Sequence, residues 1–470
     1  MLLAMALQGA IVSIDATRGR YKMQLNKLAL LVLCFLISWS ARGASDDLVA
    51  KVTNDQELRE IYGDPWTSVD GVELSSLPTN SDTLQRLIDN SEDGDTVELQ
   101  EGWYTNPEGS DSDKPLAEID KNLTIDGKGL VVIDSQRQGP AVFVSNPSTE
   151  VTLSNITIIN GKGDEGAGII SNAKKLKLEN CSFYNNLANE GAGVYSKNGE
   201  VQILDSIFSS NVAMNSMIIQ DAGKLVIEGS EFSNNTAFEY GNVANKVGDS
   251  NNKVVPAKDL QPSDFNLVIK NSRFLNNKGI ATNGDSSGVG TAIIYIVGSN
   301  AFIDNCLFGL NSAEIGASQV YAGNSSILLS NCTISSNKVT GLGLGCGVCL
   351  SRCSAVLNQC NISYNQLPHV APTESLYRLF KGGGLYIDRS NVTLKGCSIS
   401  HNTGGYGGAI YNNQGNLVLD SCEVLDNTAL ALELNGDESG GLGGGIYNNG
   451  TLKLRNCSIA ENTPDDLYHP

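Results

Sequence analysis

The residues best suited to acid–base chemistry lie in long connecting segments of the sequence. Asp437 and Glu438 are adjacent acids, and an earlier segment carries His369, Glu374 and Arg378. A carboxyl group and an imidazole held against one substrate can act as general acid and general base. Nothing in the sequence brings these groups together, so we interpret them as solvated loop charges and expect no catalytic residue.

A second set of candidates is a series of tyrosines, each of which directly follows an aliphatic residue in a short alternating run. Successive side chains of a strand point to opposite faces, so an inward aliphatic residue turns the next residue outward. The tyrosines are Tyr195, Tyr295, Tyr321, Tyr386, Tyr411 and Tyr447, and Cys349 interrupts the series.

Two interpretations of these tyrosines remain open. They could form a platform for sugar rings or for an apolar patch on a partner. They could also stack on one another and stabilise strand pairing, which is the interpretation that we favour. The candidate ligand-binding residues are therefore Tyr295, Tyr321, Tyr386, Tyr411 and Tyr447.

The cysteines offer either metal ligands or disulfides. Cys346, Cys349 and Cys353 have a metal-like spacing, but Cys346 and Cys349 fall on opposite faces, so we expect no zinc site. A Cys349–Cys353 link across a turn fits the spacing better. We expect no metal and no other cofactor.

These candidates are embedded in a repeat of about 25 residues. Each copy contains an inward aliphatic residue, an alternating run, a small Ser or Cys, an apolar residue two positions later and an Asn three positions after that. The Ser or Cys position holds Cys181, Ser206, Ser230, Ser272, Cys306, Cys332, Cys360, Cys397, Cys422 and Cys457. Neighbouring cysteines of this series could pair as disulfides, although a row of buried free thiols is slightly favoured.

Each copy is predicted to be three short strands joined by tight turns, with one apolar face. One such coil cannot bury its apolar face alone, but stacked coils close a continuous core. The sequence therefore predicts an all-β protein, a right-handed parallel β-helix, with a short N-terminal capping helix near Leu84. We expect Asn at the turn to adopt the left-handed backbone conformation. Four insertions, 236–264, 278–290, 366–381 and 428–441, are expected at one corner, just after this Asn.

The N-terminal region reads as a secretory signal peptide. A short basic stretch precedes the apolar run Leu28–Ile37, and small residues follow it. We predict a signal peptide over 1–43, with Met23 as a possible alternative start, and an extension over 44–80. The β-helix is expected over 81–462 and a tail over 463–470, with no transmembrane segment in the mature chain.

Composition excludes some partners. The chain carries 32 Lys and Arg against 51 Asp and Glu, a net charge of −19. Such a surface repels phosphate backbones, so we expect no nucleic acid partner. Ten N-x-S/T sequences are present, and they would be glycosylated in a eukaryotic secretory route.

The repeat resembles those of polymorphic outer-membrane proteins and adhesin-like β-helix proteins, within the wider pectin-lyase-like group. The resemblance rests on GGAI at 407–410 and on FxxN tetrads such as FYNN at 183–186 and FLNN at 274–277, and it covers roughly residues 80–462. It implies a secreted or surface-displayed passenger used for adhesion. The catalytic sets of polygalacturonases and pectate lyases find no match here in order.

We therefore predict a secreted, non-catalytic, adhesin-like protein of the extracellular space or cell surface. Its partner would be an extracellular glycan or a cell-surface protein. The alternative is a polysaccharide lyase, hydrolase or epimerase built on the same scaffold.

Overall fold

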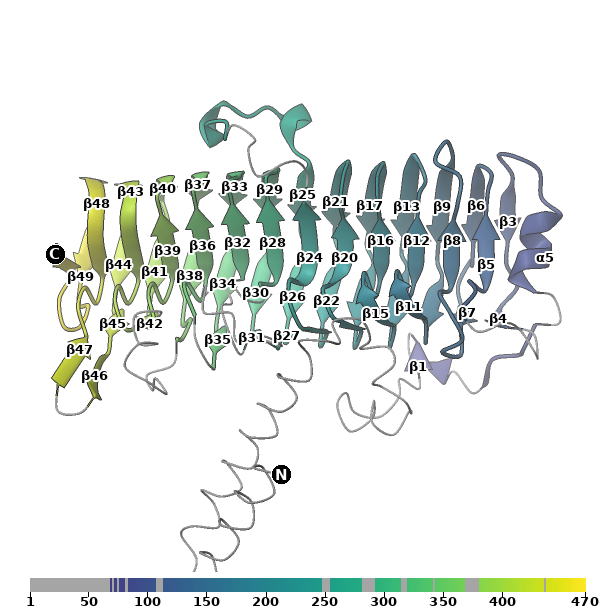
Figure 1. Cartoon of the computed structure of the whole chain (residues 1–470), viewed down its shortest axis with the longest axis horizontal. Helices are drawn as coiled ribbons and strands as arrows, with labels where there is room; N and C mark the ends of the chain where they lie inside the picture. The colour runs from purple at the N-terminus through teal and green to yellow at the C-terminus, as the bar shows by residue number, and fades with distance from the viewer. Residues whose placement is uncertain are drawn as a thin grey trace, which may run out of the picture. The chain divides into compact units, whose positions relative to one another are not determined.

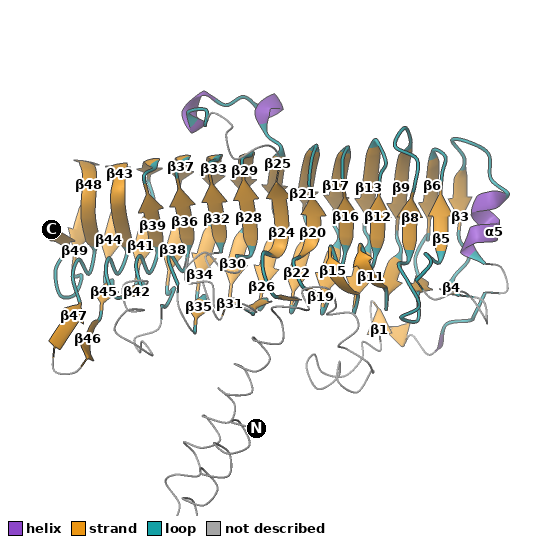
Figure 2. Ribbon diagram, in the orientation of Figure 1, coloured by secondary structure: helices purple, strands orange, loops and turns teal. Residues whose placement is uncertain are grey.

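The alternating runs of the sequence form short strands that pair with their equivalents one coil away. The computed structural model of the chain describes residues 68–69, 72–73, 76–80, 83–106, 113–246, 254–280, 292–313, 319–340, 343–367, 380–434 and 437–470. The predicted signal peptide 1–43 lies outside the described residues, as does most of the extension 44–80. Figure 1 shows the strands of successive coils side by side, and Figure 2 shows that strands dominate the coil stack.

Most full coils, or rungs, contain four strand segments, which we number in chain order within the rung; in the rung of β36–β38 an isolated bridge at Gln366 stands in place of the fourth strand. The first strands are β5 Ala117–Ile119, β8 Val142–Val144, β12 Ile169–Ser171, β16 Val194–Ser196, β20 Ser216–Gln220, β24 Gly241–Lys246, β28 Ile294–Val297, β32 Val320–Gly323, β36 Val348–Ser351 and β39 Leu385–Asp388. The second strands are β3 Thr96–Glu98, β6 Leu123–Asp126, β9 Glu150–Ser154, β13 Lys175–Glu179, β17 Glu200–Leu204, β21 Lys224–Glu228, β25 Leu267–Lys270, β29 Asn300–Asp304, β33 Ser326–Ser330, β37 Ser354–Asn358 and β40 Asn391–Lys395. β43 Ile410–Asp420 and β48 Ile446–Arg455 each combine a first and a second strand in one continuous strand. β50 Leu467–Tyr468 occupies the first-strand position of one more, incomplete rung.

The third and fourth strands complete the rung. The third strands are β4 Gly102–Thr105, β7 Val131–Asp134, β10 Thr157–Ile159, β14 Ser182–Tyr184, β18 Ile207–Ser209, β22 Glu231–Ser233, β26 Arg273–Leu275, β30 Leu307–Gly309, β34 Thr333–Ser335, β38 Asn361–Ser363, β41 Ser398–Ser400, β44 Glu423–Leu425 and β49 Ser458–Ala460. The fourth strands are β11 Lys162–Glu165, β15 Leu187–Glu190, β19 Val212–Ala213, β23 Thr236–Ala237, β27 Lys278–Gly279, β31 Ser312–Ala313, β35 Lys338–Val339, β42 Thr403–Gly404 and β45 Thr428–Ala429. The fourth strand was not predicted, because two to four residues are too few to show a period.

Pairing between equivalent strands is parallel and in register. Leu176 of β13, for example, lies between Val151 of β9 and Val201 of β17. The described exceptions are two small antiparallel pairs, β1 Ser68–Val69 with β2 Val72–Glu73 and β46 Ala431–Leu434 with β47 Asp437–Gly440. The chain is thus a right-handed parallel β-helix, as the sequence predicted.

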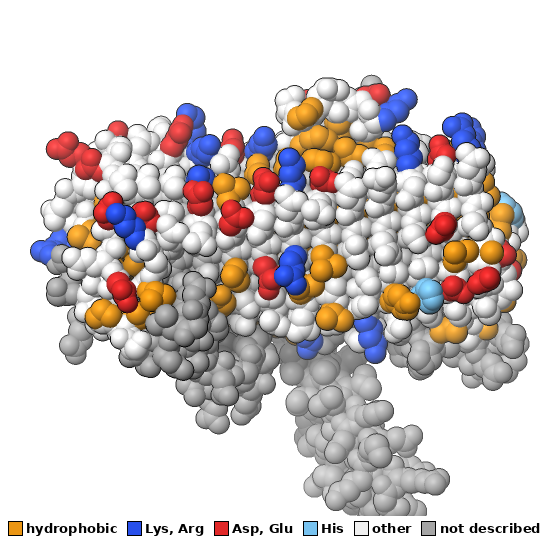
Figure 3. All heavy atoms as spheres, turned by 180° about the vertical axis from the view of Figure 1, so that it is seen from behind, with side chains coloured by type: hydrophobic (Ala, Val, Ile, Leu, Met, Phe, Trp, Pro, Cys, Tyr) orange, Lys and Arg blue, Asp and Glu red, His pale blue; other side chains and the backbone are white. Residues whose placement is uncertain are grey.

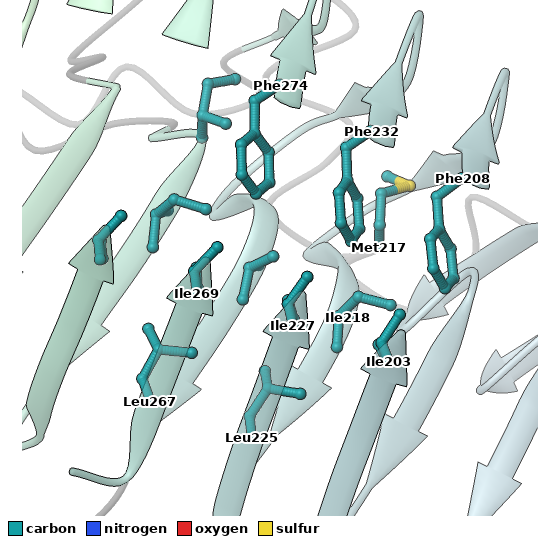
Figure 4. Packing of buried hydrophobic residues seen from close by; sticks show 14 of the residues in the cluster. Ile203, Phe208, Met217, Ile218, Leu225, Ile227, Phe232, Leu267, Ile269 and Phe274 are labelled. Atoms are coloured by element: carbon teal, nitrogen blue, oxygen red, sulfur yellow. The ribbon is translucent and has the colours of Figure 1, made fainter. Parts of the chain in front are cut away.

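The core is a set of columns, one for each inward position of the repeat. The apolar residue after the Ser or Cys position forms one column, in which Phe183, Phe208, Phe232, Phe274 and Phe308 are fully buried and stack with ring centroids 4.4–4.9 Å apart. Figure 4 shows three of these rings facing the aliphatic residues of the second strands. A glycine at 168 is required because a Cβ there would lie 2.4 Å from the Gly193 carbonyl oxygen.

A short helix covers the first rungs, as predicted. Helix α5, Leu84–Asp89, begins after Thr83, whose hydroxyl accepts the Arg86 backbone N–H at 3.2 Å. Leu84 and Ile88 are buried against the core. Gln85 exchanges two hydrogen bonds with the backbone of Glu118 in β5, at 2.6 and 3.2 Å. The helix therefore satisfies part of the exposed edge of the first rung.

The Asn of each rung is not in the left-handed conformation, which corrects the prediction. Left-handed φ occurs at the residue before it: Asn185, Ser210, Asn234, Asn276, Leu310, Ser336, Tyr364, His401, Asp426 and Glu461. The Asn side chain points inward instead. Its amide bonds the Asn of the next rung, from Asn186–Asn211 at 3.0 Å to Asn427–Asn462 at 3.0 Å.

One insertion lies at a different corner from the one predicted. Residues 236–246 form β23 and β24, so the inserted segment is 247–266, between a first and a second strand. Its described part contains two 3-10 turns, η4 Ala257–Asp259 and η5 Pro262–Asp264. The segment packs on the outer faces of β33 and β37, where Ser354 Oγ accepts the Ala257 N–H at 2.8 Å.

Candidate functional site

The candidate tyrosines form a column on the outer face of the first strands. Their Cα atoms are in register from Tyr295 to Tyr321, across Cys349, and on through Tyr386, Tyr411 and Tyr447. Ring centroids are 5.0 Å apart for Tyr295–Tyr321, 5.6 Å for Tyr386–Tyr411 and 4.8 Å for Tyr411–Tyr447, with ring planes within 16° of parallel. We call these five residues the tyrosine strip.

The strip is more buried than an outward position suggests. Tyr411 is only 6% exposed, and the other four rings are half-buried. Burial raises the pKa of Tyr295 to about 12, and it also raises the pKa of Tyr321, Tyr386 and Tyr447. Because most ring faces are covered by a neighbouring ring, with Cys349 standing between Tyr321 and Tyr386, what the stacked strip offers to a ligand is mainly ring edges and hydroxyl groups.

Stacking extends beyond the tyrosines that the sequence pattern selected. Tyr468 stacks on Tyr447 at 5.2 Å, so the predicted tail 463–470 contributes strand β50 and one more ring. Tyr240 packs on Tyr295 at 4.7 Å, and Tyr406 meets Tyr447 edge-on at 5.6 Å. Tyr468 could have been found from the sequence, since it also follows an aliphatic residue. Tyr240 and Tyr406 lie outside the alternating runs and carried no such signal.

Charged groups border the strip near Tyr411. The Lys381 ammonium lies 4.6 Å from the centre of the Tyr411 ring, within the range of a cation–π contact. In the next outward position of the first strands, Asn413 donates its amide to Asp388 at 2.7 Å. Ring hydroxyls, an ammonium, a carboxylate and an amide thus occupy neighbouring rungs, a mixture suited to binding polyols by hydrogen bonds.

Cys349 occupies the gap in the strip, and Cys353 belongs to a different position of the rung. Cys353 occupies the same position of its rung as Ser390 in the next rung, and the Ser390 hydroxyl accepts the Cys353 backbone N–H at 2.8 Å. The Cys353 thiol donates to Ala322 O at 3.2 Å. Both cysteines are free thiols, so the Cys349–Cys353 link that the spacing suggested is not formed in this structure. Burial raises the pKa of the Cys353 thiol to about 12.

The Ser and Cys position of the repeat is a continuous inner column. In its serine section, Ser230 Oγ accepts the Ser206 N–H at 3.1 Å. In its cysteine section, Cys306, Cys332, Cys360, Cys397 and Cys422 are buried free thiols. Each of Cys332, Cys360 and Cys397 donates its S–H to the thiol of the preceding rung, and this hydrogen bond together with burial raises the thiol pKa to about 12.

The loop candidates are not assembled into a site by the described residues. His369, Glu374 and Arg378 lie outside them, and Asp437 and Glu438 belong to strand β47 of the β46–β47 hairpin. Across the described ranges, no group of three or more His, Cys, Asp and Glu side chains is placed to hold a metal ion. The described helices include none with the length and apolar character needed to cross a membrane.

The inserted segment 254–266 covers part of another outer face. Phe265 packs on Phe302 of β29 with ring centroids 5.4 Å apart, and Ser326 Oγ donates to Val255 O at 2.6 Å. Figure 3 shows hydrophobic side chains gathered where this segment meets the coil stack. The outward apolar residues of the second strands, which would otherwise face water, are the reason for this cover.

The stacked parallel sheets and the inner columns define the chain as a right-handed parallel β-helix protein. Residues 318–465 match the family described as "Right handed beta helix region". No curated protein matches the chain. A solved structure similar to it is the complex of the alginate lyase AlyF-OU02 with G6, at 12% identity and a TM-score of 0.33, over 85% of this chain and 96% of that chain.

Proposed function

We propose that this protein is a secreted, non-catalytic, adhesin-like β-helix that binds an extracellular glycan or a cell-surface protein through the tyrosine strip. The single observation that supports the proposal is the strip itself. Largely buried tyrosine rings recur from Tyr295 to Tyr447 in every rung but that of Cys349, beside the charged groups of Lys381 and Asp388.

The spacing of the strip suits a repeating ligand. Neighbouring rings are 4.8–5.6 Å apart, which is comparable to the length of one sugar unit in an extended glycan. A ligand lying along the strip would meet one hydroxyl group per rung except at Cys349, and many weak contacts in a row add up to useful affinity. Because the ring faces are already stacked, binding would depend on the hydroxyl groups more than on ring faces.

The test uses two pairs of variants. Tyr386→Ala with Tyr411→Ala removes rings and hydroxyls, whereas Tyr386→Phe with Tyr411→Phe keeps the stacking and removes only the hydroxyls. We expect both pairs to lose retention on a glycan array or on cells. The Phe pair should keep the melting temperature of the parent. The Ala pair also removes the ring of Tyr411, which is only 6% exposed, so it should melt lower, and the Phe pair is the variant that separates binding from stability.

Two outcomes would reject the proposal. Unchanged binding by the Ala pair would remove the tyrosines from the binding surface. Turnover of any uronate or neutral polysaccharide, assayed with and without calcium, would instead support the lyase, hydrolase or epimerase alternative.

A further inference from the structure

The corner between the third and fourth strands carries a row of residues with left-handed backbone conformation. Short polar or acidic side chains fill most of this row, which suits the conformation because Asn, Asp and Ser tolerate it better than bulky residues. These residues are Asn185, Ser210, Asn234, Asn276, Ser336 and Asp426. The left-handed backbone conformation is therefore a general feature of the rung. The side chain at this corner differs from rung to rung.

Four corners carry longer side chains. Glu461 has a φ of 61°, and Leu310, Tyr364 and His401 have φ values of 58°, 57° and 56°. This conformation strains a bulky Leu or Tyr, whereas His tolerates it. Leu310 is 65% exposed and Tyr364 is 52% exposed, the highest values for large hydrophobic side chains among the described residues. Their burial contributes little to folding, so neither the backbone nor the core accounts for these residues. Strain kept at an exposed position is a mark of function.

Tyr364 and His401 act as one surface feature. Their rings stack with centroids 4.6 Å apart and planes 20° from parallel. On the other side of Tyr364 the next corner is Ser336, which is too small to cover the phenol ring. Within the part of the chain that the structure describes, one aromatic face is thus left open at the edge of the sheet.

The sheet face beside this pair is uncharged over three rungs. The outward residues of β34, β38 and β41 are hydroxyl and amide side chains: Thr333, Ser335, Asn361, Ser363, Ser398 and Ser400. The next rung on the C-terminal side brings acids, Glu423 and Asp426, and Asp426 lies 3.8 Å from the His401 Nε2. An anionic chain would be repelled by these acids, whereas an uncharged polyol would meet donors, acceptors and an aromatic face.

We propose that the outer face of β34, β38 and β41, bordered by Tyr364 and His401, is a second binding site that takes an extended neutral polysaccharide. A sugar ring would pack its C–H face on Tyr364, and its neighbours would hydrogen-bond to the hydroxyl and amide groups along the rungs. This site is on a different sheet from the tyrosine strip and does not depend on it.

The test replaces Tyr364 and His401 with Asn, the residue that several other rungs carry at this corner. Tyr364→Asn with His401→Asn restores the side chain found at Asn185, Asn234 and Asn276, so the double variant should melt at the same temperature as the parent or higher. The full chain is passed over insoluble cellulose, chitin and xylan. We expect the parent to be retained on at least one of them and the double variant to bind about tenfold more weakly or not at all.

Ser210→Asn, at a distant corner of the same row, is the matched control and should retain the parent's affinity for the neutral polysaccharide. Absence of retention on all three materials, equal retention by the double variant, or preferential retention on alginate or polygalacturonate would each overturn the proposal. A lower melting temperature with unchanged retention would show that the Tyr364–His401 pair is structural.

Discussion

The small residue in each rung shows how a single side chain is matched to its corner. The Cys397 thiol donates to Lys395 O at 3.5 Å and to Leu357 O at 3.3 Å. The hydroxyls of Ser206 and Ser272 make the same local bond, to the carbonyl two residues earlier, at 2.7 Å each. A donor of this size is what the corner accommodates, which explains why both Ser and Cys occur at this position of the repeat.

Substitution of Cys397 tests this matching. Cys397→Ser should change the free energy of unfolding by less than about 1 kcal/mol, since the hydroxyl keeps the hydrogen bond. Cys397→Leu should overpack the corner and cost about 1–3 kcal/mol. Urea unfolding of the two variants measures both effects. Equal stability would show that the position can hold a larger side chain than its close packing in the structure implies.

The buried Asn column is held by several hydrogen bonds at each rung. Asn402 Oδ1 accepts the backbone and side-chain N–H groups of Asn365, at 3.0 and 2.9 Å. Its amide donates to Ile362 O at 2.8 Å and to Asn427 at 3.0 Å. Asn402→Ala would leave several of these groups without partners in the core.

We expect Asn402→Ala to lower the free energy of unfolding by about 2–4 kcal/mol, because each buried polar group left without a partner costs about 1–3 kcal/mol. Asn416→Ala is the matched control. Asn416 donates its amide to Asn391 at 2.7 Å in an exposed column, so its loss should cost less than about 0.5 kcal/mol. Comparable losses in the two variants would contradict a special role for the inner column.

Strands and turns could be predicted from the sequence where a residue type recurs once per rung, and could not be predicted where no such repeat is present. The aliphatic, Phe and Ser or Cys positions were predicted because each recurs once per rung and points inward. The left-handed corner was misplaced by one residue, because Asn recurs at two adjacent positions of the repeat. The first, as at Asn185, has the left-handed backbone, and the second, as at Asn186, has the buried side chain. The inserted segment 247–266 was assigned to the wrong corner because β24, Gly241–Lys246, lacks the tyrosine that marks other first strands.

The candidate site was predicted in part for the same reason. Periodicity selected the tyrosine strip and its direction but could not show that the rings cover one another's faces. The exposed corner pair Tyr364 and His401 gave no signal at all, since residue type varies at that position while the backbone conformation is constant. Only the φ values and the exposure distinguish it.

The inserted segment 254–266 should open independently of the rungs beneath it. Its anchors include the Ala257–Ser354 and Val255–Ser326 hydrogen bonds and the Phe265–Phe302 contact, and the variant below removes the first and the last of these. In a Phe265→Ala, Ser354→Ala variant, we expect faster amide hydrogen exchange in 254–266 while β29 and β33 keep the protection of the parent. Phe274→Ala, in the core column, is the contrasting control and should lower protection across the neighbouring rungs. Faster exchange of β29 or β33 in the first variant would contradict independence.

At the scale of the whole molecule, the columns of buried tyrosines and thiols are expected to make the free energy of unfolding decrease as the pH rises into the alkaline range. Burial raises the pKa of Tyr295, Cys181 and Cys353 to about 12, and raises that of Tyr195, Tyr321 and Tyr386 as well. The folded chain therefore keeps protons that the unfolded chain loses near pH 8.5 for Cys and pH 10 for Tyr. Above those values the unfolded state binds fewer protons, so the stability contributed by these groups is complete below about pH 8 and is lost as the pH rises toward 12.

We expect the urea midpoint to fall steadily between about pH 9 and 12, with each fully buried group adding up to about 1.4 kcal/mol per pH unit to the slope. Tyrosinate absorbance of the strip should appear together with unfolding, not before it. The Tyr386→Phe, Tyr411→Phe pair removes two of the titrating groups without disturbing the stacking, so its stability should decline less steeply over the same range. If all 15 tyrosines ionised near pH 10 while the far-ultraviolet spectrum stayed native, the rings would have to be open to solvent, and the burial of the strip would be contradicted.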